Sequence, residues 1–141
     1  MEQPAPHSEL SDREFERAFR SGTFPPQAFS HKAHLRLAWL LLRRHGKDRA
    51  QEMICSQIRA FSLRNGAAGK YHHTLTRAAV CLVWDCMQAS EAPDFETLLR
   101  GHPSLTGNFR EMLLAHYSEN RLFSEQARTE FMEPDRERFS Y

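Results

Sequence analysis

One segment of the chain is apolar on nearly every side of a helix, and this segment limits the fold more than any other feature. Its apolar residues are Leu35, Leu37, Ala38, Trp39, Leu40, Leu41 and Leu42. A helix that is apolar all round lies in the centre of a protein, whereas a surface helix shows one apolar stripe. The longest apolar run, residues 37–42, is far too short to cross a bilayer. The sequence therefore predicts a central buried helix and no membrane association.

Start and stop signals mark this helix and the one before it. Ser11 and Glu14 match a capping box, in which each side chain binds the backbone N–H of the other residue, and Gly22 is placed to end the helix. Ser30 can cap the central helix at its start, and Gly46 can terminate it after about residue 45. Two helices, over about 11–21 and 31–45, are therefore expected.

The rest of the chain has the same helical periodicity. Asp48 is a candidate cap for a third helix, and a fourth helix should begin near residues 71–73 and run to about 88, with two apolar faces. The third helix has one buried stripe, formed by Ala50, Ile54, Ile58 and Phe61. Shorter helices are expected over about 93–101, 108–117 and 124–131. Because the fourth helix has two apolar faces, it is expected to be the second central helix.

No segment shows the alternation of polar and apolar residues that is typical of a strand. The 141 residues suffice for one domain and leave little room for a second. The expected fold is all-α, a single-domain helical bundle of about five to seven helices, two of them central. Residues 1–10 are expected to form a flexible N-terminal arm, and residues 11–141 a single helical domain.

The charge balance argues against nucleic acid as a partner. Nineteen Lys and Arg residues face eighteen Asp and Glu residues, a formal net charge of +1, whereas non-specific phosphate binding needs a basic excess or a basic stripe. The three cysteines have no CxxC spacing and suggest reduced thiols. The N-terminal segment lacks the pattern of a secretory signal. A cytoplasmic protein is expected, and a homodimer remains an open alternative.

Histidine is the residue type that points to chemistry, because the chain contains eight of them. Two pairs lie at helix starts, His31 and His34 in the central helix and His72 and His73 in the fourth. If these two helices run parallel, with the third returning the chain, the pairs meet at one end of the bundle. Converging imidazoles suit Zn, Fe and other first-row metals. The sequence thus predicts a divalent transition metal, Zn, Fe or Mn, at His31, His34 and His72, with His73 as a weaker candidate.

Three hydroxyl-bearing residues flank the second pair and are candidate catalytic residues. Tyr71, Thr74 and Thr76 could bind a substrate, a bound water or the second nitrogen of a ligand imidazole. The competing interpretation is structural: Thr74 helps to cap the fourth helix, and Tyr71 packs against the preceding loop. On the residues alone the structural interpretation is favoured.

Four further residues are candidates for the same end of the bundle. His102 returns there if the fifth helix descends, and Glu111 then lies in the first turn of the next helix. Arg36 and Arg77 could hold an anionic substrate if they turned inward. The default expectation is that both arginines are solvated or paired with glutamates.

Two motifs resemble those of a family of small, uncharacterised bacterial proteins. Residues 29–39 are similar to its F-x-H-x-x-H-[LV]-R helix start, and residues 70–76 to its K-Y-H-x-T-[LIV]-T segment. The likeness covers about residues 24–136. Where the family often has Glu after the motif histidine, this chain has His73. The resemblance implies that the motif positions are the ones to test and implies no reaction type.

Three functions are compatible with these patterns. The first is a small metalloenzyme, a hydrolase or an oxidoreductase, that activates water or dioxygen at the histidines and acts on a small-molecule substrate. The second is a metal-free module that binds a small molecule, with the same histidines as hydrogen-bond partners, or a haem-binding variant of it. The third is a helical protein that recognises a partner through its helix faces.

Overall fold

A computed structural model describes residues 7–139, and within this part of the chain every regular element is helical. The longer helices are α1 (Asp12–Ser21), α2 (His31–His45), α3 (Lys47–Arg64), α4 (His73–Ala89) and α5 (Phe95–Gly101). Shorter ones follow, α6 (Ser104–Gly107), α7 (Phe109–Leu114), α8 (Glu119–Leu122) and α9 (Glu125–Thr129). Single 3-10 turns lie at His7–Glu9, Pro26–Ala28 and Ala68–Lys70. The all-α expectation is confirmed. None of the described helices is long and apolar enough to span a membrane.

The predicted ends of the first two helices are confirmed. Ser11 and Glu14 form both bonds of the capping box, and Gly22 ends α1 in the left-handed conformation with φ of 82°. The Ser30 hydroxyl accepts a hydrogen bond from the backbone N–H of Ala33 at the start of α2, and Gly46 follows its last residue. These local signals work because they satisfy backbone groups that a helix leaves unpaired at its ends.

Two other helix starts differ from the expectation. Gly46 serves as N-cap of α3 without a side-chain bond, so Asp48 lies inside the first turn and is not the cap. The N-cap of α4 is His72, which was expected inside that helix. Each helix therefore starts one or two residues away from the predicted position. The turn at Gly46 leads directly into α3, and the His72 imidazole accepts the hydrogen bond that caps α4.

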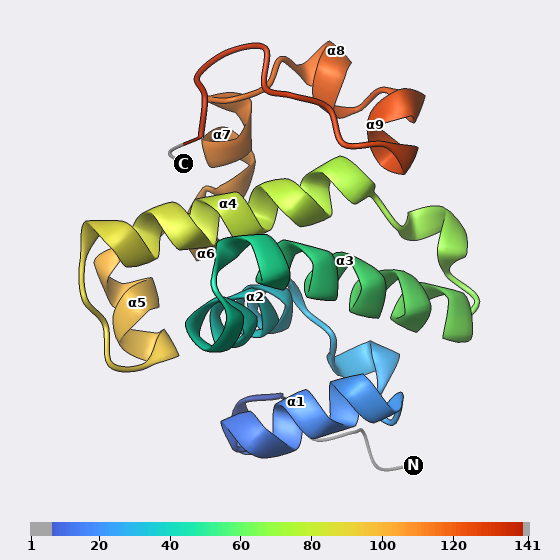
Figure 1. Ribbon diagram of the computed structural model, residues 1–141, viewed down its shortest axis with the longest axis vertical. Coiled ribbons are helices and arrows are strands. Elements are labelled where there is room, and N and C mark those ends of the chain that lie inside the picture. The colour runs from blue at the N-terminus through green and yellow to red at the C-terminus, as the bar shows by residue number, and fades with distance from the viewer. Residues whose placement is uncertain (1–6, 140–141) are drawn as a thin grey trace.

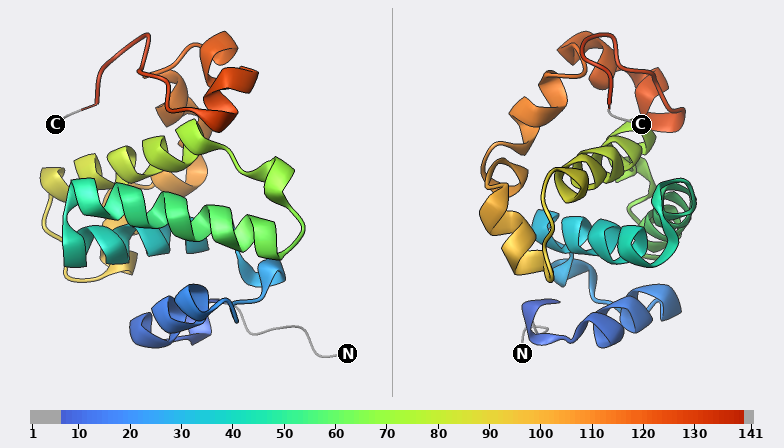
Figure 2. Two further views of the ribbon diagram at one scale, coloured as in Figure 1. Left: turned by 45° about the vertical axis from the view of Figure 1, so that its right-hand side comes forward. Right: turned by 60° about the vertical axis from the view of Figure 1, so that its left-hand side comes forward.

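The three long helices α2, α3 and α4 pack against one another, but not as an up-down bundle (Figure 1). The chain runs along α3 in one direction and returns along α4. Figure 1 shows α2 nearly end-on while α3 and α4 lie across the view, and the right-hand view of Figure 2 shows α2 lengthwise and α3 end-on. The expectation that α2 and α4 run parallel was therefore wrong: α2 crosses the α3–α4 pair steeply.

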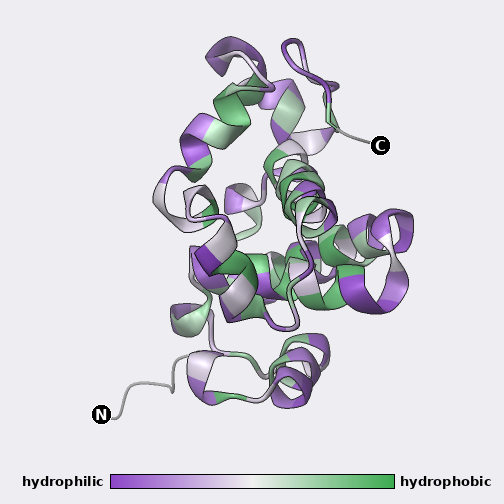
Figure 3. Ribbon diagram, turned by 90° about the vertical axis from the view of Figure 1, so that its left-hand side faces the viewer, coloured by the Kyte–Doolittle hydropathy of each residue, from purple (hydrophilic) through white to green (hydrophobic). Residues whose placement is uncertain are grey.

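The interior consists of two clusters of buried apolar side chains, with α4 between them. The larger cluster joins α1, α2, α3 and α5 to one side of α4, where Val80 and Val83 are fully buried. The smaller cluster joins the other side of α4, including Ala78 and Leu82, to α7, α8 and the C-terminal segment. Figure 3 shows the hydrophobic residues on the facing sides of these helices. Both α2 and α4 are central, as predicted.

The expected N-terminal arm is packed where it can be described. Residues 1–6 lie outside the described part of the chain, but His7 is buried and begins a 3-10 turn. The buried Arg36 guanidinium donates hydrogen bonds to the carbonyl oxygens of His7 at 2.6 Å and Leu10 at 2.8 Å, and pairs with the Asp12 carboxylate at 2.8 Å. Residues 7–10 thus belong to the folded domain. Arg36 turns inward, but it holds the chain's own backbone.

Candidate functional site

Three of the four histidines, His31, His34 and His72, line a pocket of about 360 Å³ between the start of α2, the second half of α3, the start of α4, and α7. We call it the His34 pocket. Its lining consists of Phe29, His31, His34, Ile58, Ser62, Lys70, Tyr71, His72, Leu75, Thr76, Ala79, Phe109 and Leu113. Its volume lies within the range of small-molecule sites. The prediction that His31, His34 and His72 come close is correct, although the helices cross and do not run parallel.

His34 is the side chain in the pocket whose polar group is left unsatisfied. It lies in the first turn of α2, where its ring stacks on Phe29 at a centroid distance of 5.8 Å. Its Nε2 atom is buried and has no hydrogen-bond partner. Burial, and secondarily the neighbouring His31, lowers the pKa of His34 from 6.5 to about 4. His34 is therefore a neutral imidazole at pH 7.

His31 is tied to the opposite wall of the pocket. Its Nε2 lies 2.8 Å from the carbonyl oxygen of Leu105, and its ring lies 4.5 Å from that of Phe109. A carbonyl only accepts hydrogen bonds, so Nε2 carries the proton and Nδ1 is the remaining acceptor. His31 thus joins the start of α2 to α6 and α7.

Both ring nitrogens of His72 are engaged by the protein backbone. Its Nδ1 accepts a hydrogen bond from the N–H of Leu75 at 3.0 Å, which caps α4, and its Nε2 donates to the carbonyl oxygen of Leu122 at 2.9 Å. Burial is the main cause that lowers the pKa of this histidine, and the Arg128 charge adds to it. A metal at His72 would have to displace one of these two bonds.

His73 and Tyr71 form a separate pair. The Tyr71 hydroxyl lies 2.7 Å from His73 Nδ1, and burial raises the pKa of Tyr71. His73 lines a different surface pocket, beside Cys55 and Arg77, and does not line the His34 pocket. Burial first, and then the charges of Arg59 and Arg77, lower its pKa. His73 therefore lies apart from the three histidines of the His34 pocket.

The two threonines make structural hydrogen bonds. The fully buried Thr74 hydroxyl donates to the carbonyl oxygen of Glu130 at 2.8 Å and accepts from the N–H of Met132 at 3.2 Å, so it holds the C-terminal segment and does not cap α4. The Thr76 hydroxyl donates to the carbonyl oxygen of His72 at 2.7 Å, one helical turn back. The catalytic roles considered for these residues and Tyr71 stay predictions.

The side-chain positions do not support a shared metal centre. Among the residues from 7 to 139, no group of three or more His, Cys, Asp or Glu side chains is arranged to hold a metal ion. The four histidines expected as ligands divide between two pockets, and His72 already uses both nitrogens. Metal binding at this place stays a prediction without structural support.

Two of the remaining candidates lie elsewhere. His102 Nε2 is 3.0 Å from the hydroxyl of Ser90, which follows the last residue of α4. Because α4 is about 25 Å long at 1.5 Å per residue, this contact lies far from the pocket at the start of the helix. Glu111 is exposed on α7 and does not line the His34 pocket. Instead of these polar residues, Phe109 and Leu113 line the pocket, and the carbonyl oxygen of Leu105 bonds to His31.

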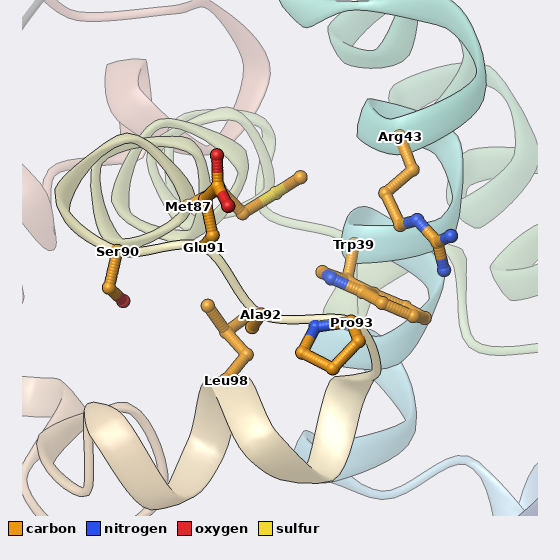
Figure 4. Close-up of a pocket in the computed structure, with 8 residues that line it drawn as sticks. All are labelled: Trp39, Arg43, Met87, Ser90, Glu91, Ala92, Pro93 and Leu98. Atoms are coloured by element: carbon orange, nitrogen blue, oxygen red, sulfur yellow. The ribbon is translucent and has the colours of Figure 1, made fainter.

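Another hollow, of about 500 Å³, lies between α2, the far end of α4 and α5 (Figure 4). Arg43 and Glu91, which are exposed and of opposite charge, line it together with the buried Trp39. The Arg43 guanidinium lies 4.5 Å from the centre of the Trp39 ring. None of its lining residues has a buried polar atom without a partner. The His34 pocket is therefore the stronger candidate site.

The sequence did not single out several residues of the pocket. Lys70, Phe29 and the α7 residue Phe109 line it. The first two lie inside the motifs around the histidines, and this proximity was the only available signal. Phe109 could not be found in this way, because the course of residues 102–109 depends on tertiary packing.

Comparisons with family models, with curated proteins and with solved structures gave no match.

Proposed function

We propose that this chain is a binding protein for a small molecule that occupies the His34 pocket and is held there without a metal. The unpartnered, buried Nε2 of His34 is the observation that carries the proposal. Buried polar atoms in proteins are almost always hydrogen-bonded, and one without a partner costs about 1–3 kcal/mol. A ligand that pairs with this nitrogen recovers that free energy on binding.

The pocket offers what such a ligand needs. Its polar lining includes the imidazoles of His31 and His34 and the Lys70 ammonium group. The remaining wall is largely apolar and includes Phe29, Leu75 and Phe109. A concave apolar site with a few converging polar groups is the usual form of a small-molecule site.

The test compares the wild-type chain with a His34→Leu variant. Ligand-observed NMR with a fragment library should identify binders. In protein-observed spectra of the wild type, these binders should shift the methyl signals of Leu75 and Leu113. These binders should lose at least about tenfold in affinity in the variant, because the hydrogen bond to His34 is gone. His45→Leu is the matched control, since His45 is exposed at the other end of α2.

Folding of the variant is not a confounding factor. Replacing a buried polar group that lacks a partner by an apolar one removes its desolvation cost, so His34→Leu should unfold at equal or higher urea concentration. Fragment binding that does not distinguish His34→Leu from His45→Leu would refute the proposal.

Elemental analysis distinguishes the proposed metal-free binding protein from the metal-dependent enzyme predicted from the sequence. Protein purified without an affinity tag should contain no stoichiometric Zn, Fe or Mn if the proposal is right, and its melting temperature should not respond to a chelator. Stoichiometric metal that is lost in His34→Leu would refute the metal-free proposal and support the metalloenzyme.

A further inference from the structure

The charges around the His34 pocket have one sign. Lys70 is the one charged group among the described residues that line it, and no Asp or Glu side chain does so. From this juxtaposition of a single cation, three imidazoles and an apolar wall, we infer that the ligand is a monocarboxylate with an apolar body. The inference rests on the proposed function and names its ligand class.

The rim of the pocket adds further positive charge. Arg128 donates a hydrogen bond to the carbonyl oxygen of Gly69, the residue before Lys70, and also pairs with the Glu125 carboxylate at 3.3 Å. Arg59 lies over the Tyr71 ring, 4.9 Å from its centre. An anion that enters here is attracted by Lys70 and Arg59, whereas an ammonium ligand would be repelled by them.

The histidine electrostatics agree with this charge pattern. Burial is the largest cause of the lowered pKa values of His34, His72 and His73. The charged neighbours that add to it are cationic: Arg128 beside His72, and Arg59 and Arg77 beside His73. No anionic neighbour offsets them, so the site lacks a counter-charge that a carboxylate would supply.

Lys70 and His34 are buried to different extents, so they would contact the ligand at different depths of the pocket. Lys70 is exposed and ends the 3-10 turn Ala68–Lys70, so its ammonium group can reach an anion at the mouth. The neutral imidazole of His34 lies deeper and provides one N–H donor. Hydrogen bonds to charged groups are stronger than neutral ones, at about 1.5–3 kcal/mol. The apolar body of the ligand then packs against Ile58, Leu75 and Leu113.

The experiment uses three probes that share one alkyl chain and differ in the head group: octanoate, 1-octanol and octylamine. Titrations of the full chain at pH 7.5, followed by NMR, give each dissociation constant. Octanoate should bind at least about tenfold more tightly than 1-octanol, and octylamine more weakly than either. Raising the salt concentration should weaken octanoate binding only, because screening acts on the charged head group.

Two variants localise the effect. Lys70→Gln should reduce octanoate affinity several-fold and leave 1-octanol unchanged. Arg100→Gln, at an exposed cation of α5 that does not line the pocket, should leave all three affinities unchanged. Equal binding of octanoate and 1-octanol, with both weakened in His34→Leu, would overturn the carboxylate inference while the proposed function stands. Preference for octylamine would also overturn it, and absence of binding by all three probes would count against both.

Discussion

At the scale of single residues, His72 shows how a side chain with the chemistry of a ligand can serve structure. Its Nδ1 caps α4, and its Nε2 fixes the carbonyl of Leu122 in the C-terminal region. Ser, Thr, Asp and Asn are the usual N-caps, so an imidazole was not expected to cap this helix. His34 shows the reverse case: a histidine in the first turn of a helix, with a buried nitrogen that the protein does not satisfy.

A pair of substitutions tests the capping role. His72→Ala should lower the free energy of unfolding by about 1–2 kcal/mol, because it removes the cap and the bond to Leu122. His72→Asn should recover part of this loss, since an Asn side chain can accept the capping bond. Urea denaturation measures both. If Ala and Asn at this position have equal stability, His72 does not act as a cap.

The pH dependence of stability tests the environment of His34. Its pKa falls from 6.5 to about 4 on folding, so between these values the unfolded chain binds more protons than the folded one. Stability therefore decreases as the pH falls from 6.5 towards 4, and the contribution of His34 is unchanged above this window. At pH 5 the loss relative to pH 7.5 should be about 2 kcal/mol larger in the wild type than in His34→Leu.

The two urea titrations at pH 5 and pH 7.5 include their own control. Other groups that titrate in this range, such as His7 and His73, are present in both proteins and cancel in the difference. An identical pH dependence of wild type and His34→Leu would show that His34 is protonated as easily in the folded chain as in water.

At the scale of elements, local signals predicted helix ends better than helix directions. Ser11, Gly22 and Ser30 act where expected, because a cap depends on a few neighbouring residues. The steep crossing of α2 over α4 was not predictable in the same way. An all-round apolar helix such as α2 can be buried at many angles, and side-chain packing over the whole contact selects one.

The link between the N-terminal segment and α2 allows an element-scale prediction. Arg36→Met keeps most of the apolar stem but removes the bonds to His7, Leu10 and Asp12. We expect a loss of about 1–3 kcal/mol in stability and faster amide hydrogen exchange over residues 7–14. Arg44→Met removes another cation that pairs with α1, at Glu16, and is the control. Equal exchange over residues 7–14 in both variants would contradict the assigned anchoring role.

At the scale of the whole molecule, the sequence predicted the site only in part. The approach of His31 and His34 to His72 was predicted correctly, but from parallel helices, whereas in the structure α2 crosses α4. The separation of His102 could not be predicted, since it follows from how the chain packs after α5, where His102 bonds to Ser90 just beyond α4. In the described part of the chain, two large apolar side chains are exposed, Leu63 on α3 and Phe123 after α8. A homodimer stays a prediction.

The bonds from the start of α4 to the last quarter of the chain have a consequence for synthesis. His72 and Thr74 find their partners at Leu122, Glu130 and Met132, roughly fifty residues later. A nascent chain on the ribosome can therefore assemble α1 to α3 early but leaves this side of α4 uncovered until residues 122–132 have been synthesised. Translation arrest or a premature stop codon between α4 and residue 132 should leave this apolar surface exposed and recruit chaperones.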